Sequence, residues 1–78
     1  MKTTDAIKQR ILELCDKNNL SLNKLGVISN LDPSTITSIF YGKSKNPTIT
    51  TIKSICDGLN ITLFDFFNCE IFKDKYLD

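Results

Sequence analysis

The sequence predicts a small all-α domain, and three features of its 78 residues favour that fold class. Apolar residues make up 41% of the chain, which is enough for one hydrophobic core and too much for a disordered tail. They recur at the three- and four-residue spacings of amphipathic helices, and no stretch alternates for long between apolar and polar residues as a half-buried strand would. Residues suited to starting or ending helices divide the chain into five segments. We therefore expect a compact five-helix domain over residues 1–78.

The first expected helix carries its apolar residues on one face. We expect Thr3 or Thr4 to cap it, and we expect it to end at Asn18-Asn19, because asparagine tolerates turns and left-handed backbone. The apolar face holds Ile7, Ile11, Leu14 and Cys15, and the other faces hold Lys8, Gln9, Arg10, Glu13 and Asp16.

A second, short helix is expected after Ser21, which is a favourable N-cap residue. Leu25 and Ile28 share its inner face.

The segment Ser29–Pro33 predicts a tight turn between the second and third helices. Asn30 accepts a positive φ, Asp32 is a strong N-cap, and Pro33 suits the first helical position. The third helix is expected to run to about Tyr41, with Gly42 as a left-handed stop.

Thr48 is expected to open a fourth helix that ends near Gly58 and Asn60. Its inner face would hold Ile49, Ile52, Ile55, Cys56 and Leu59. Thr62 and Asp65 have the spacing of a capping box and predict a fifth helix with Leu63, Phe66 and Phe67.

Residues 69–78 predict no single structure. Ile71, Phe72 and Tyr76 are candidates either for a dimer contact or for closing the core.

The composition argues against an enzyme, a metal protein and a membrane protein. Histidine, the commonest general base and metal ligand, is absent, and three cysteines without C-x-x-C spacing predict neither a zinc site nor a disulfide framework. We expect no cofactor. With no apolar run near 20 residues and no signal-peptide pattern at Met1–Asp5, the expected location is cytoplasmic.

The charge is unevenly distributed along the chain. Residues 1–16, 17–53 and 54–78 carry net charges of 0, +4 and −3, for a total of +1. A positive middle suits a domain that presents one face to a polyanion, although an ordinary solvated surface explains five lysines equally well.

The outward face of the third helix has an unusual composition. With Ile36, Ile39 and Phe40 inside, the outward side chains are Ser34, Thr37, Ser38 and Tyr41. A solvated helix face usually carries Lys, Glu and Gln, whereas these hydroxyl side chains are uncharged and mostly short. Such a face can approach a polar surface closely, and threonine methyl groups can contact thymine.

Three motifs carry a resemblance to a known family. They are Ser21-Leu22-Asn23-Lys24-Leu25-Gly26, Asn30-Leu31-Asp32-Pro33-Ser34-Thr35-Ile36, and the segment from Tyr41-Gly42 through Asn46-Pro47 to Ile52. Over about residues 5–68 the chain resembles the lambda-repressor-like helix-turn-helix family, the Cro and phage-repressor (XRE) type, which leaves 69–78 as a C-terminal tail.

The resemblance implies a DNA-binding transcriptional regulator, expected to act as a repressor and to bind a double-stranded operator as a homodimer. The third helix would enter the major groove. The base-facing residues would be Pro33, Ser34, Thr37 and Ser38, and the phosphate-facing residues would be Ser21, Asn23, Tyr41, Lys43, Ser44, Lys45 and Asn46.

The chain departs from the family pattern at several positions. Leu22 stands where the family often has glutamine, and Gly26 where it usually has alanine. Val27 and Ile28 replace polar residues, and we expect them to pack under a loop. The alternative is that they mark a partner surface, as in an antitoxin-like protein-interaction module on the same fold. Cys15 and Phe40 occupy the positions of an Arg–Glu pair in the family, and we expect them to touch in the core.

Overall fold

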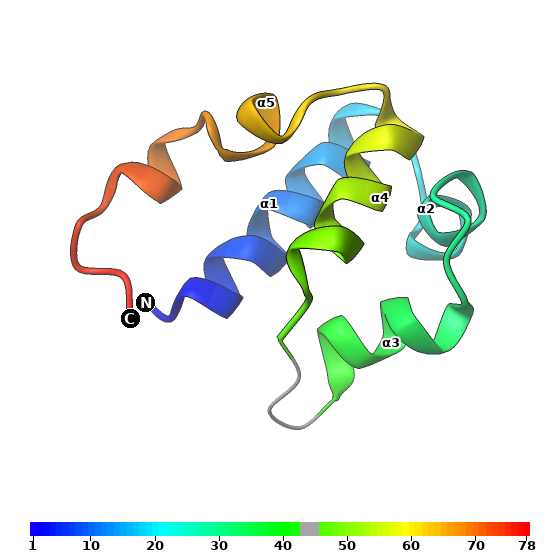
Figure 1. The fold of residues 1–78 in the computed structure, drawn as a ribbon, viewed down its shortest axis with the longest axis horizontal. Coiled ribbons are helices and arrows are strands. Elements are labelled where there is room, and N and C mark those ends of the chain that lie inside the picture. The colour runs from blue at the N-terminus through cyan, green and yellow to red at the C-terminus, as the bar shows by residue number, and fades with distance from the viewer. Residues whose placement is uncertain (43–45) are drawn as a thin grey trace.

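Five α-helices and a short 3-10 helix make up the computed structural model, which describes residues 1–42 and 46–78, and these residues contain no strand. Figure 1 shows α1 and α4 in the middle of the molecule with α5 above α1, α2 and α3 at one end, and the C-terminal segment at the other. The elements are α1 (Thr3–Lys17), α2 (Leu22–Ile28), α3 (Pro33–Tyr41), α4 (Ile49–Leu59), α5 (Leu63–Phe67) and the 3-10 helix η1 (Glu70–Lys73). The predicted all-α, five-helix fold is confirmed.

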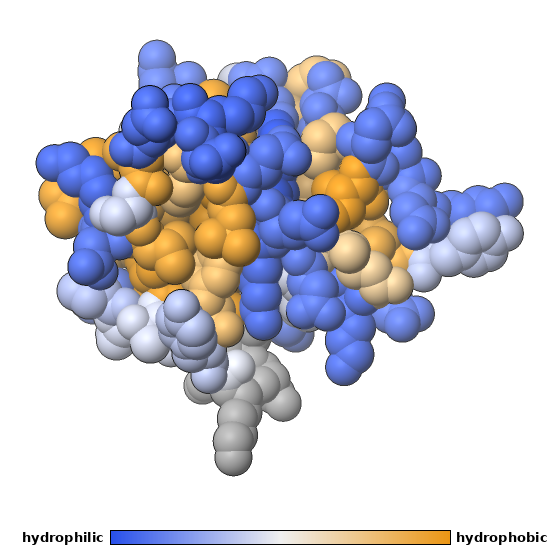
Figure 2. Space-filling view, turned by 180° about the vertical axis from the view of Figure 1, so that it is seen from behind, coloured by the Kyte–Doolittle hydropathy of each residue, from blue (hydrophilic) through white to orange (hydrophobic). Residues whose placement is uncertain are grey.

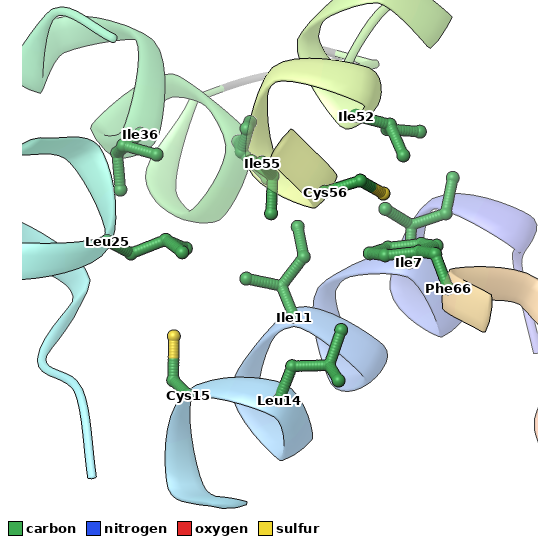
Figure 3. Close-up of a cluster of buried hydrophobic side chains, with 11 residues drawn as sticks. Ile7, Ile11, Leu14, Cys15, Leu25, Ile36, Ile52, Ile55, Cys56 and Phe66 are labelled. Carbon is green, nitrogen blue, oxygen red and sulfur yellow. The ribbon is translucent and has the colours of Figure 1, made fainter. Parts of the chain in front are cut away.

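A single hydrophobic core joins all five α-helices (Figure 3). Leu25 from α2 and Ile36 from α3 point into the same cluster as Ile11 from α1 and Ile55 from α4. The two helices that form the helix-turn-helix are therefore held by the centre of the domain. The buried members of the cluster are Ile7, Ile11, Leu14, Cys15, Leu25, Ile36, Ile39, Ile52, Ile55, Cys56 and Phe66.

Three of the predicted helix caps are present. The Ser21 hydroxyl accepts a hydrogen bond from Lys24 N at 3.1 Å, and Thr48 accepts one from Thr51 N at 3.1 Å. Thr62 and Asp65 form the predicted capping box at the start of α5. The predicted cap of α1 is wrong: both threonines lie within the helix, and the N-cap is Lys2, whose side chain makes no capping bond.

Asparagine, rather than glycine, supplies the left-handed backbone at the helix ends. Asn19, Asn30 and Asn60 have φ values of 54°, 55° and 59° after α1, α2 and α4. The predicted left-handed stop at Gly42 is wrong. Gly42 is extended, with φ −75° and ψ 147°, and its N–H bonds to Ser38 O at 3.0 Å. The chain leaves α3 in a conformation that any residue can adopt.

Two residues differ from the prediction in their burial. Ile49 is 58% exposed, because that end of α4 borders an open hollow beside Leu63, Phe64 and Phe67. Arg10 is only 8% exposed. Its guanidinium donates from Nε to Phe66 O at 2.7 Å and from Nη2 to Asp65 O at 2.8 Å. Because carbonyls near a helix C-terminus lack helical partners, this burial is compensated and fixes α5 on α1.

The C-terminal segment folds back over the core. Phe72 in η1 packs against the core, with its ring centroid 4.9 Å from that of Phe67, whereas Tyr76 is exposed. At the end of the segment, Asp78 O accepts a hydrogen bond from Thr3 N at 2.9 Å. Within the described residues, no helix combines the length and the apolar composition that crossing a bilayer requires.

Candidate nucleic-acid interface

The helix-turn-helix is formed by α2, the turn at residues 29–32 and α3. The two helices approach closely at Gly26, where a Cβ atom would lie 3.3 Å from Ile36 Cγ1 and 3.7 Å from Leu31 O. The turn closes with Leu31 N donating to Gly26 O at 2.9 Å, beside the left-handed Asn30. Close packing and a hydrogen-bonded turn together fix the angle at which α3 projects from the domain.

Burial of Ile36 and Ile39 turns the opposite side of α3 outward. Pro33, Ser34 and Thr37 are exposed there. The spacing predicted this exposure for Ser34 and Thr37. Ser38 is only half-buried rather than fully exposed, so it lies at the edge of the face. Tyr41 is 78% exposed at the end of the helix. This outward face of α3 has no charged side chain, and the opposite face of the helix packs in the core.

The hydroxyl groups on this face are not equivalent. Thr37 Oγ1 donates to Pro33 O at 2.9 Å, so this hydroxyl can still accept a hydrogen bond but has already used its proton. Ser34 has no hydrogen bond of this kind within the described residues, so its hydroxyl can donate or accept.

Of the predicted phosphate-facing residues, four can be placed. Ser21, Asn23, Tyr41 and Asn46 are all exposed. The Ser21 hydroxyl caps α2 as an acceptor, which leaves its proton available to a phosphate oxygen. Lys43, Ser44 and Lys45 lie outside the described residues.

An apolar hollow lies beside α3, between its first turn and α2, and the prediction did not include it. Its volume is about 360 Å³, and its lining consists of Leu22, Asn23, Gly26, Val27, Leu31, Pro33 and Ile36. Figure 2 views the molecule from behind and shows apolar side chains gathered over the half that α2 and α3 occupy. Leu22 and Val27, which differ from the family pattern, are the sequence features that could have indicated this hollow. Their position beside Pro33, however, depends on the packing of α2 on α3.

Val27 and Ile28, which we expected to pack under a loop, differ in burial. Ile28 is half-buried and packs against the core. Val27 is 71% exposed, whereas the buried residues of α2 are Leu25 and Gly26. Its side chain therefore belongs to the molecular surface.

Two of the cysteines, Cys15 and Cys56, are buried and have little nucleophilic character. Burial raises the pKa of the Cys15 thiol, and burial is also the main reason that the pKa of Cys56 is raised. Both thiols are core residues. Among residues 1–42 and 46–78, no three His, Cys, Asp or Glu side chains are grouped as they would be around a metal ion.

Two comparisons with known proteins agree with this geometry. A family model described as a Cro/C1-type HTH DNA-binding domain matches residues 10–71. The crystal structure of the prophage Lp1 protein 11 is similar, with a TM-score of 0.83 and 36% sequence identity over 95% of this chain and 99% of that chain. No curated protein matches the sequence. The predicted resemblance is confirmed, and the chain belongs to the Cro/C1-type helix-turn-helix family of DNA-binding domains.

Proposed function

We propose that this protein is a sequence-specific transcriptional regulator that inserts α3 into the DNA major groove and acts as a repressor. The observation that carries the proposal is the uncharged hydroxyl face of α3, which is exposed while the opposite face is fixed in the core. A helix fits the major groove, and serine and threonine can bond to base edges there. Occupying a promoter is sufficient for repression, and the match of residues 10–71 to a Cro/C1-type DNA-binding domain supports binding to DNA.

The proposed contacts are of two kinds, base contacts that determine sequence preference and phosphate contacts that determine affinity. Pro33, Ser34, Thr37 and Ser38 face the bases, where contacts determine the preferred sequence. The phosphate contacts supply affinity and register. They come from Ser21, Asn23, Tyr41, Lys43, Ser44, Lys45 and Asn46.

A homodimer on a two-fold symmetric site completes the proposal, because such sites place two recognition helices in successive major grooves. For the dimer contact we favour the apolar surface of α4 and α5 over the C-terminal tail. Phe64 is 73% exposed and Ile49 is 58% exposed, and they flank an apolar hollow with Leu63 and Phe67. Phe72, in contrast, already packs in the core.

The test is a selection of binding sites from random DNA, followed by titrations at several salt concentrations. Ser34→Ala should change the preferred site, at roughly 1–3 kcal/mol for each disturbed base contact, with little change in the salt slope. The double variant Lys43→Ala/Lys45→Ala should weaken binding to all sequences and reduce the salt slope by about 0.9 for each lost phosphate contact.

Ser54→Ala is the matched control, because Ser54 lies on α4 and bonds to Thr50 O within its own helix. It should change neither site preference nor salt slope. A Ser34→Ala protein that keeps the wild-type preference would contradict the assignment of α3. Failure to bind any DNA at low salt, together with co-purification of a protein partner, would favour an antitoxin-like interaction module instead.

A further inference from the structure

The hollow between α2 and α3 differs chemically from the rest of the proposed DNA surface. The recognition face of α3 presents hydroxyl groups, whereas the hollow is lined mainly by the apolar atoms of Leu22, Val27, Leu31, Pro33 and Ile36. Gly26 has no side chain with which to fill it, and Val27 is 71% exposed, so the hollow is open to solvent.

The position of the hollow connects it to base reading. Leu22 and Pro33 are the first residues of α2 and α3, and both line it. Pro33 directly precedes Ser34, the residue proposed to face a base. Asn23, proposed to face a phosphate, is on α2 and also lines the hollow. A duplex in contact with both Ser34 and Asn23 would therefore lie beside the hollow.

The chemistry of the hollow selects among base edges. In the major groove, guanine, adenine and cytosine present donors and acceptors, whereas thymine adds a 5-methyl group. An apolar lining cannot replace the water that polar base groups lose on contact, so those groups would remain unpaired. A methyl group loses no hydrogen bond there and gains apolar contact. 5-Methylcytosine carries the same group at the same position of its ring.

We propose that Leu22 and Pro33 form a site for the 5-methyl group of a pyrimidine, in the operator a thymine, and that this site determines specificity at one base pair of each half-site. The proposal rests on the proposed function, since it assumes that α3 enters the major groove. It adds an apolar discriminator to the polar contacts of Ser34 and Thr37.

The experiment removes single methyl groups from the DNA. The duplex obtained by selection is resynthesised with deoxyuridine in place of each thymine in turn, and affinities are measured by titration. At one position per half-site we expect about a fourfold loss for each methyl removed, which corresponds to about 0.8 kcal/mol per buried carbon, and about a 15-fold loss when both half-sites are changed. Placing cytosine at that position should weaken binding further, and 5-methylcytosine should recover about fourfold.

The residues are tested by the ratio of thymine to deoxyuridine affinity within each variant. A loss of correctly folded protein cancels in this ratio, so Leu22→Ala stays informative even though Leu22 also packs against the core. We expect the ratio to fall to about one in Leu22→Ala and to fall partly in Pro33→Ala. Leu12→Ala is the control, because Leu12 is an exposed leucine on α1, and it should keep the wild-type ratio.

Several outcomes would overturn the proposal. One is site-specific binding that is insensitive to deoxyuridine at every thymine. Another is a sensitivity that Leu22→Ala and Pro33→Ala leave unchanged, which would assign the methyl contact to another part of α3. Either result would leave major-groove reading by Ser34 intact. Failure of the wild-type chain to bind any duplex would refute the proposed function and this inference together.

Discussion

The substitution Gly58→Ala has opposite expected effects on stability from helix propensity and from the packing of α4 against α2. Gly58 lies in the last turn of α4, next to the C-terminal end of α2. A Cβ atom there would lie 2.7 Å from Ser29 Oγ, 2.8 Å from the Ile28 carbonyl oxygen and 2.9 Å from the Ile28 carbonyl carbon. Two of these atoms belong to the backbone and cannot rotate away. The glycine therefore allows α2 and α4 to pack closely, which explains its place inside the helix rather than at its end.

The magnitude follows from two opposing terms. Alanine is more favourable than glycine in a helix by about 1 kcal/mol, so propensity alone predicts stabilisation. Forcing extra volume into a packed contact costs roughly 1–3 kcal/mol, and contact with backbone favours the upper part of that range. We expect a net destabilisation of about 1–2 kcal/mol. For a chain of this size, that lowers the melting temperature by roughly 4–16 °C.

Gly26→Ala is the matched control in the assay, which is thermal and urea denaturation followed by circular dichroism. A Cβ atom at Gly26 would approach Ile36 Cγ1 at 3.3 Å, and a side chain can shift by the few tenths of an ångström needed. Gly26→Ala should therefore be neutral or stabilising by up to about 1 kcal/mol. A Gly58→Ala protein as stable as the wild type, or less destabilised than Gly26→Ala, would refute the reasoning.

Three further perturbations test other contacts. Arg10→Met keeps an apolar stem but loses the hydrogen bonds to Phe66 O and Asp65 O. In denaturation experiments it should lower the free energy of unfolding by roughly 2–4 kcal/mol. An unchanged melting temperature would show that α5 is held without these bonds. Deleting residues 70–78 removes Phe72 from the core and should lower stability by roughly 1–3 kcal/mol, while sedimentation stays as in the full chain if the dimer contact lies on α4 and α5. The pKa of Asp65 is lowered, mainly by the hydrogen bond from the Thr62 backbone, so its contribution to stability is complete above about pH 4 and is lost as pH falls through the lowered pKa. Asp65→Asn should therefore lose less stability than the wild type between about pH 4 and pH 2 in acid-melting curves, and parallel curves would contradict this.

The features that sequence reasoning predicted correctly depend on neighbours within four residues. Ser21, Thr48 and the Thr62–Asp65 pair cap their helices through bonds to residues three positions away. Asn30 adopts the left-handed turn for which its side chain is suited. Each of these interactions is complete within one turn of chain, so its residues stand together in the sequence.

Arg10 shows why other features could not be predicted. Its spacing from Ile7 and Leu14 places it on the apolar face of α1, but its charge suggested exposure. The carbonyls that make its burial possible lie 55 and 56 residues further along the chain, on α5. The exposure of Ile49 likewise depends on a hollow formed with α5. The burial of Arg10 and the exposure of Ile49 can be predicted only once it is known which helices contact each other.

The candidate site contains one feature that the sequence predicts and one that depends on which helices meet, and the two differ in how they could recognise DNA. The hydroxyl face of α3 was predictable, because burial of Ile36 and Ile39 alone determines what lies opposite. A serine hydroxyl can both donate and accept, so Ser34 contributes to the site preference, but it can pair with more than one base edge. Discrimination needs an element that penalises the wrong base, and an apolar wall does so by leaving polar edges unpaired. Leu22 and Pro33 form such a wall only because the α2–α3 turn brings the two helix starts together. The polar residues that sequence identifies would thus contribute the hydrogen-bonding part of the site preference, and the apolar residues brought beside them by folding would add discrimination at one further base pair of each half-site.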